Sequence, residues 1–349
     1  DGVGEVGVVY HYRRLNNKWI SYSKHVLNDN DLSQMGPEPR FGAAVAFEPN
    51  GNYFAVGAPN DIRRGKPGGG VYIYTSVYTA RDLTASWYAY VEPLPDDGQG
   101  FGESVSLSNN ADYIAVGTPF YTNTVNAQGR VDVYTRSGTV CTHQATLYSP
   151  TPQTEARFGN PVLINPEGDT LYVSSYHDNN AMGNTAGAIY IFKRTGTNWA
   201  FTGKILPPET TTAFGVGVCR DPMRKLVYIS AMRLPYAQSV VYQYAENAGS
   251  LTFVKKVLTL KTAAVEGEPE YASSLSMDEK GRWLAAGEYY RSEQRYQSGV
   301  VQMFSTMDFN LQTEPYFLMN NEKKMLQLSK IYPPTANQGS NFGVSVKVS

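Results

Sequence analysis

The fold of this 349-residue chain is decided by one stretch near its start: Phe41-Gly42-Ala43-Ala44-Val45, then Ala55-Val56-Gly57-Ala58-Pro59, then Gly70-Val71-Tyr72-Ile73-Tyr74. Each segment is short, alternates its side chains with a period of two, and is bounded by Gly, Pro or Asn, which is the pattern of a β-strand. A looser fourth segment, Trp87-Tyr88-Ala89-Tyr90, follows. The stretch therefore predicts one antiparallel sheet of four strands.

The stretch recurs along the chain at intervals of about 60 residues, and such self-similarity is the signature of a repeat architecture. A single four-stranded sheet leaves two apolar faces exposed, whereas radial stacking of several sheets buries them. We therefore predict an all-β fold, a β-propeller of four-stranded antiparallel blades. Copies of the first segment begin at Phe41, Phe101, Phe158, Phe214, Tyr271 and Phe342.

The aromatic residue that opens each copy is expected to wedge between neighbouring blades, where its ring can bury a large area. Small residues after it, such as Gly42 and Ala43, suit a crowded strand next to the axis, because a missing Cβ lets backbones approach closely. We expect mostly buried side chains at Phe41, Phe101, Phe158, Phe214 and Phe342.

We interpret residues 1–349 as a single propeller domain with six or seven blades, seven being favoured if the natural chain is longer. The chain starts at Asp1 without an initiator Met, which indicates a processed product or a part of a larger chain or assembly. Residues 1–28 are expected to supply outer strands of the first blade, and residues 341–349 the inner strand of the last. The other blades are placed at 40–95, 100–150, 157–209, 213–261 and 271–334.

The Phe-Gly start, the Val-Gly-Ala-Pro segment and the Gly-x-Val-Tyr-x-Tyr strand together resemble the FG-GAP repeat of integrin-alpha-like propellers. The resemblance implies a ring that usually has seven blades, and an extracellular or cell-surface role. Calcium-binding members carry Asp-x-Asp-x-Asp-Gly in the hairpin between the first two strands, where carboxylates converge on a hard cation. The hairpins here hold few acids, such as Asp169 or Asp278 with Glu279, so we predict no cofactor and no metal site.

Charge and hydropathy argue against two kinds of partner. The chain has 30 basic and 31 acidic residues and a formal net charge of −1, whereas nucleic acid selects for a basic excess. No stretch of about 18 apolar residues is present, so we expect no membrane insertion in this segment. The two cysteines, Cys141 and Cys219, fall on strands two blades apart and are predicted not to form a disulfide with each other.

The sequence contains no recognisable catalytic motif. Its four histidines, His11, His25, His143 and His177, share no short window with each other or with a serine nucleophile motif. We therefore predict that the chain is not an enzyme. A polysaccharide-acting hydrolase or lyase, the least favoured alternative, requires clustered carboxylates at the mouth of the central channel.

The connections between second and third strands are long, and they mix aromatic residues with Arg, Asp and Asn. In a propeller these loops emerge on one face, together with the fourth-to-first connections, and long loops on a rigid scaffold are where function concentrates. We predict an extracellular or cell-surface binding or adhesion module that recognises a protein or glycan through this face, with a lectin-like carbohydrate-binding propeller as the alternative. The candidate binding residues, chosen because Tyr and Arg are enriched at hot spots, are Arg63, Arg64, Tyr121, Tyr176, Tyr236, Tyr289, Tyr290 and Arg291.

Overall fold

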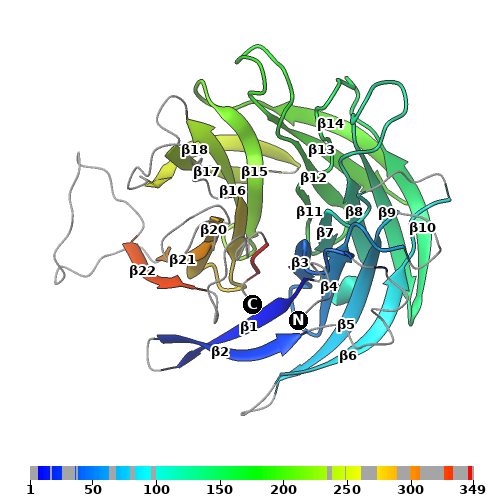
Figure 1. Ribbon diagram of the computed structural model, residues 1–349. Coiled ribbons are helices and arrows are strands. Elements are labelled where there is room, and N and C mark those ends of the chain that lie inside the picture. Colours follow the sequence, from blue (N-terminus) through cyan, green and yellow to red (C-terminus); the bar gives the residue numbers. More distant parts are fainter. Residues whose placement is uncertain are drawn as a thin grey trace.

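The protein is a ring of antiparallel sheets arranged around a central axis, as the computed structural model shows (Figure 1). The structure describes residues 7–15, 18–25, 36, 38–62, 68–78, 83–95, 100–233, 238–247, 249–260, 273–288, 299–306, 326–332 and 345–347. Among these residues every named element is a strand except one short 3-10 helix, η1 (Asn109–Ala111). The predicted β-propeller of four-stranded antiparallel blades is therefore confirmed.

Blades 1 to 3 follow one another in the chain, each with its four strands hydrogen-bonded in sequence order. Blade 1 contains β3 (Ala44–Phe47), β4 (Tyr53–Ala58), β5 (Gly70–Tyr78) and β6 (Leu83–Val91). Blade 2 contains β7 (Ser104–Leu107), β8 (Tyr113–Thr118), β9 (Arg130–Ser137) and β10 (Val140–Leu147). Blade 3 contains β11 (Val162–Ile164), β12 (Thr170–Ser175), β13 (Ala188–Thr195) and β14 (Asn198–Ile205).

Blades 4 and 5 repeat the arrangement, and a two-stranded sheet accompanies them. Blade 4 contains β15 (Thr212–Asp221), β16 (Leu226–Arg233), β17 (Gln238–Asn247) and β18 (Ser250–Leu260). Blade 5 contains β19 (Ser274–Met277), β20 (Trp283–Glu288), β21 (Val300–Ser305) and β22 (Leu326–Ile331). The two-stranded sheet pairs β1 (Val9–Leu15) with β2 (Lys18–His25).

The prediction of six or seven blades was wrong, because the described residues form five four-stranded blades. The sequence pattern counts the residues that open a blade, and an opening does not guarantee four paired strands. In the N-terminal region the described residues form two strands, β1 and β2, which pair with each other. The copy that opens at Phe342 lies outside the described residues apart from Ser345–Lys347.

The two-stranded sheet lies between blade 5 and blade 1. The Tyr12 hydroxyl in β1 donates to the Tyr332 carbonyl just after β22, at 3.0 Å. On the other side, Gly7 lies so close to Phe41 that a Cβ added to the glycine would overlap the phenylalanine carbonyl oxygen. Gly69 stands in the same relation to Phe101, so the contact between β1 and blade 1 repeats the contact between blades 1 and 2.

The C-terminal segment Ser345–Lys347 also makes a contact that the blades repeat. The Ser345 hydroxyl accepts a hydrogen bond from the Val45 N–H of blade 1, at 2.9 Å. The Ser104 hydroxyl of blade 2 accepts one from the Val162 N–H of blade 3, at 2.8 Å. Ser345–Lys347 therefore lies beside the innermost strand of blade 1 as that strand's neighbour around the axis.

Neighbouring blades are joined at the phenylalanine that opens each one. The Phe158 N–H of blade 3 donates to the Gln128 carbonyl of blade 2, at 3.1 Å, and Gly129 forms an isolated parallel bridge with Phe158. Gly129 has a φ of +81°, which a glycine adopts at little cost. The ring of Phe158 packs edge-on against Tyr190 and Phe192 of its own blade, with centroid separations of 5.5 and 6.0 Å.

The predicted burial of these phenylalanines is confirmed wherever the structure describes them. Phe101, Phe158 and Phe214 are 0% exposed and Phe41 is 3% exposed, whereas Phe342 lies outside the described residues. Phe101 belongs to an apolar cluster that combines residues of blades 1 and 2, including Val71 and Ile114. The opening aromatic is thus part of the core between blades.

Truncation of a joining phenylalanine should destabilise the ring strongly. We expect Phe158→Ala to lower the free energy of unfolding by about 3–5 kcal/mol, because it removes a fully buried ring and leaves a cavity. The matched control is Phe201→Ala in β14, whose ring is 44% exposed and should cost much less. Urea unfolding followed by tryptophan fluorescence would measure both values. Equal costs for the two variants would contradict the role of Phe158 in the core.

Candidate functional site at the mouth of the axial channel

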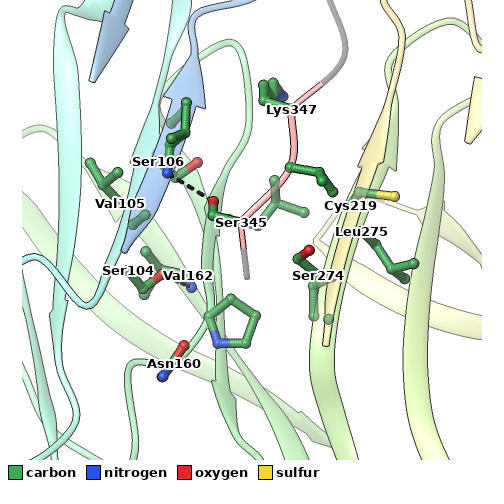
Figure 2. A pocket seen from close by; sticks show the side chains of 18 of the residues that line it. Ser104, Val105, Ser106, Asn160, Val162, Cys219, Ser274, Leu275, Ser345 and Lys347 are labelled. Carbon is green, nitrogen blue, oxygen red and sulfur yellow. Dashed lines mark hydrogen bonds between the residues drawn. The ribbon is translucent and has the colours of Figure 1, made fainter. Parts of the chain in front are cut away.

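A cavity of about 470 Å³ runs along the axis and is lined by the innermost strands of the blades. Figure 2 shows Ser104, Val105, Ser106 and Val162 on one side of it and Cys219, Ser274 and Leu275 on the other, with Ser345 and Lys347 between them. The lining mixes hydroxyl groups with short apolar side chains. The channel is therefore wide enough and polar enough to accept part of a ligand.

The two ends of the channel differ in the kind of chain that surrounds them. One end, here called the hairpin face, carries the turns between first and second strands at 48–52, 108–112, 165–169, 221–225 and 278–282. The other end, the loop face, carries the connections from second to third strands and the residues just before each innermost strand. Of the predicted binding residues, the two that the structure describes, Tyr121 and Tyr176, belong to the loop face.

Acidic side chains on the hairpin face are used to close the turns. The Glu48 carboxylate accepts hydrogen bonds from the N–H groups of Asn52 and Asn50, at 2.7 and 2.9 Å. The Asp278 carboxylate accepts one from the Trp283 N–H, at 2.8 Å. Because these carboxylates are committed to backbone donors, they are turn caps of the kind that Asx motifs provide.

The loop face carries a connected set of side chains around the channel opening, which we call the mouth cluster: Arg40, Glu103, Phe120, Arg157 and Tyr176. Arg40 of blade 1 pairs with Glu103 of blade 2, with 3.1 Å between Nη1 and Oε1. The Arg157 guanidinium lies over the Phe120 ring, 5.1 Å from its centroid. The same guanidinium donates to the Tyr176 hydroxyl at 3.3 Å.

The backbone conformation just before each innermost strand sets the position from which these arginine side chains extend. Arg40 and Arg157 have φ values of 53° and 55°, in the left-handed region that few non-glycine residues occupy. The residues at the same repeat position in blades 2 and 4, Gly100 and Ala213, are also left-handed, with φ of 105° and 52°. The conformation therefore belongs to the repeat, and two of the four positions place an arginine there.

Two buried polar atoms of the mouth cluster make no hydrogen bond within the described part of the chain. They are Oε2 of Glu103, whose side chain is 10% exposed, and Nε of Arg157. A buried donor or acceptor left unsatisfied costs about 1–3 kcal/mol. Phe120, by contrast, is 37% exposed. The cluster thus combines a partly exposed aromatic ring with one acceptor and one donor that lack a partner among the described residues.

The loops of the loop face are tied to their blades by buried polar contacts. In blade 1 the Asp61 carboxylate accepts from the hydroxyls of Tyr72 and Tyr90, at 2.6 and 3.0 Å. In blade 3 the Asp178 carboxylate accepts from the Tyr190 hydroxyl at 2.6 Å and pairs with Lys204 at 2.9 Å. These contacts hold the first turn of each loop against the third strand.

Blade 2 exchanges the two partners of this contact. The loop position carries Tyr121, and the acid moves to the strand as Asp132, which pairs with Arg130 at 2.8 Å. The Arg130 guanidinium lies over the Tyr121 ring, 4.4 Å from its centroid. Tyr121 is therefore half-buried against its own blade, and it does not line the cavity.

The eight candidate residues from the sequence thus fall into three groups. Tyr176 lies in the mouth cluster, and Tyr121 packs on Arg130 beside the cluster. The rest lie outside the described residues or outside those whose side chains are described: Arg63, Arg64, Tyr236, Tyr289, Tyr290 and Arg291. Whether any of the eight binds a ligand stays a prediction.

Sequence reasoning missed four members of the cluster: Arg40, Glu103, Phe120 and Arg157. Two of them leave a signal in the sequence, because Arg40 and Arg157 stand directly before the Phe-Gly pair of their repeats. The prediction of binding residues used the longer loops and did not use the residue before the repeated motif. Glu103 could be recognised only once blades 1 and 2 were known to meet at this point.

Neither a membrane-spanning helix nor a metal-binding group of side chains occurs among the described residues. Within these ranges no helix is long and apolar enough to cross a membrane. Likewise, the described side chains contain no group of three or more His, Cys, Asp or Glu residues placed to hold a metal ion.

No protein-family model and no curated protein matches the chain, so the FG-GAP resemblance is not confirmed. Similar solved structures include a protein from Lactobacillus plantarum, 13% identical, with a TM-score of 0.50 over 98% of this chain and 85% of that one. A putative 6-phosphogluconolactonase from Bacteroides uniformis is 11% identical, with a TM-score of 0.49 over 93% and 94% of the two chains. The periplasmic gluconolactonase of Pseudomonas aeruginosa is 14% identical, with a TM-score of 0.46 over 85% and 91%.

At these identities the likeness shows the propeller fold alone. It nevertheless corrects one expectation, because the neighbours include propellers named as 6-phosphogluconolactonase and gluconolactonase, which are enzymes. The prediction that this chain is not an enzyme is contradicted by them. The reason is physical: a ring can assemble a reactive site from loops of separate blades, so a missing local motif does not exclude catalysis.

Cys219 lines the cavity, so the reactivity of its thiol measures how well the cavity wall excludes water. The two cysteines are not bonded to each other, as predicted, and burial raises the pKa of the Cys219 thiol to about 12. Because the thiolate is the nucleophile, we expect Cys219 to resist iodoacetamide at pH 8 in the native protein and to react in urea. Mass spectrometry would locate the label. Native-state labelling of Cys219 at the rate of the unfolded chain would show that the wall opens.

His177 reports the charge of the mouth cluster. Its ring lies 4.5 Å from that of Tyr176, and burial, followed by the charge of Arg157, lowers the His177 pKa below its ordinary value. We expect Arg157→Ala to raise the His177 pKa, because a nearby positive charge disfavours the imidazolium. An NMR titration of the His177 ring protons measures this. The control is Arg282→Ala on the hairpin face, which should leave the His177 pKa unchanged. If the His177 pKa also stayed unchanged in Arg157→Ala, the charge of Arg157 would have no effect on His177.

Proposed function

We propose that this chain is an extracellular or cell-surface binding module that recognises a glycan or a protein through the mouth cluster on its loop face. The observation that carries the proposal is the exposed Phe120 ring, held beneath the Arg157 guanidinium at the rim of the axial cavity. An accessible aromatic face beside an arginine is the combination found at binding hot spots.

The shape of the site favours the glycan. A volume of about 470 Å³ falls within the range of small-molecule sites, roughly 300–1,000 Å³. An aromatic ring offers a flat apolar face to a sugar, while the acceptor on Glu103 and the donor on Arg157 match hydroxyl groups. A flat protein partner, in contrast, would leave the cavity below Phe120 unused.

The cell-surface location is supported by the repeat itself. The Phe-Gly, Val-Gly-Ala-Pro and Gly-x-Val-Tyr-x-Tyr segments resemble those of integrin-alpha-like propellers, which work outside the cell. The near-neutral net charge of −1 is consistent with a ligand that is read by shape and hydrogen bonding more than by long-range attraction.

The proposal predicts the effect of removing the aromatic platform. On an array of immobilised glycans, we expect the full chain to bind a defined subset, and Phe120→Ala to weaken that binding at least tenfold, since a stacking face is lost. The matched control is Met223→Ala on the hairpin face, where a more accessible apolar side chain, 70% exposed, is removed.

Circular dichroism and thermal unfolding would confirm that both variants keep the fold. Loss of binding in Met223→Ala with Phe120→Ala unaffected would place the site on the hairpin face. Absence of binding to every glycan on the array would remove glycan recognition from the proposal.

A further inference from the structure

Two arginines of the mouth cluster occupy the same repeat position but have different partners. Arg40 stands before Phe41 and is neutralised by Glu103, the second residue after Phe101 in the next blade. Arg157 stands before Phe158, and the residue at the position of Glu103 in the blade that follows is Val216. The repeat therefore supplies a carboxylate to one arginine and a side chain without charge to the other.

The surroundings of Arg157 leave its charge available. Its guanidinium contacts the Phe120 ring and the Tyr176 hydroxyl, both neutral groups. It forms no ion pair with the acids whose positions the structure describes, and its Nε is buried without a hydrogen-bond partner. Burial, followed by the charge of the same guanidinium, lowers the pKa of the neighbouring His177 below its ordinary value.

Glu103 supplies an acceptor on the other side of Phe120. Gly100 connects the two, because its carbonyl accepts from the Glu103 N–H at 3.1 Å, while a Cβ at Gly100 would fall 2.8 Å from the Phe120 ring. One carboxylate oxygen of Glu103 is held by Arg40, and the other is buried and without a partner among the described residues. The contacts therefore run from Arg40 to Glu103, through the Gly100 backbone to Phe120, and from Phe120 to Arg157.

We propose that the mouth cluster binds a carboxylate-bearing sugar, such as a uronic acid residue of a polysaccharide. The sugar carboxylate pairs with Arg157, its ring stacks on Phe120, and a ring hydroxyl donates to Oε2 of Glu103. Arg157 is the residue that selects acidic over neutral sugars. This inference rests on the proposed function, since it names the ligand class of the same site.

The charges of the cluster favour a carboxylate over a phosphate. Arg157 contributes a single positive charge, because Arg40 is already paired with Glu103. A carboxylate carries one negative charge and fits the planar fork of a guanidinium through two hydrogen bonds. A phosphate ester carries close to two negative charges, and the cluster offers no second unpaired positive charge to match the additional one.

The test compares three ligands of the full chain by isothermal titration calorimetry: methyl glucuronide, methyl glucoside and glucose 6-phosphate. We expect the glucuronide to bind at least tenfold more tightly than the glucoside, a difference of about 1.4 kcal/mol. Arg157→Ala should abolish this preference, because it removes the charge that distinguishes the two ligands, whereas Arg157→Lys should keep part of it.

Equal affinities of the wild-type chain for the two methyl glycosides would overturn the inference, as would a preference that survives in Arg157→Ala. Tighter binding of glucose 6-phosphate than of the glucuronide would show that the site prefers a phosphate, and this result would also overturn the inference. The absence of binding by all three ligands would overturn it as well. In each case the proposed function is judged separately, because Phe120-dependent binding of neutral glycans on the array would still support it.

Discussion

The ring depends on one backbone contact, the pairing of the glycine that precedes a third strand with the phenylalanine that opens the next blade. Gly69 meets Phe101 in this way and Gly129 meets Phe158, each pair forming a parallel bridge. A side chain on either glycine would overlap a backbone carbonyl, so the approach requires the missing Cβ. Because the phenylalanine ring then fills the core, the same residue fixes both the spacing of the blades and their burial.

This contact explains why the sequence revealed the architecture and not the number of blades. The Phe-Gly pair and the glycine before the third strand, such as Gly69, are local patterns, and a local pattern repeated at regular intervals predicts the contact between any two neighbours. A blade count needs the pairing of strands far apart in the chain. The two-stranded sheet at the N-terminus opens with a glycine that contacts Phe41, yet it contains only β1 and β2. Six openings therefore led to an overestimate, while the described residues form five complete blades.

The mouth cluster was only partly predictable for a similar reason. The loop that carries Tyr176 was visible from its length and composition, whereas Arg40 and Glu103 are 63 residues apart and meet only because their blades are neighbours. Tyr121 was chosen as a binding residue, but in blade 2 the loop acid and the strand tyrosine change places, so its ring packs on Arg130. An exchange of this kind preserves the contact between loop and strand but changes which side chain is exposed. A pattern of residue types does not reveal that change.

The left-handed residue ahead of each innermost strand has a consequence for how such rings diversify. Blades 1 to 4 place Arg40, Gly100, Arg157 and Ala213 there with the same backbone conformation. The repeat thus specifies the course of the backbone at this point but not the side chain, which ranges from the hydrogen of glycine to the guanidinium of arginine. Two of these positions, Arg40 and Arg157, line the channel. Substitutions there could retune which ligand the opening accepts while the blades, their joints and their hydrophobic cores stay as they are.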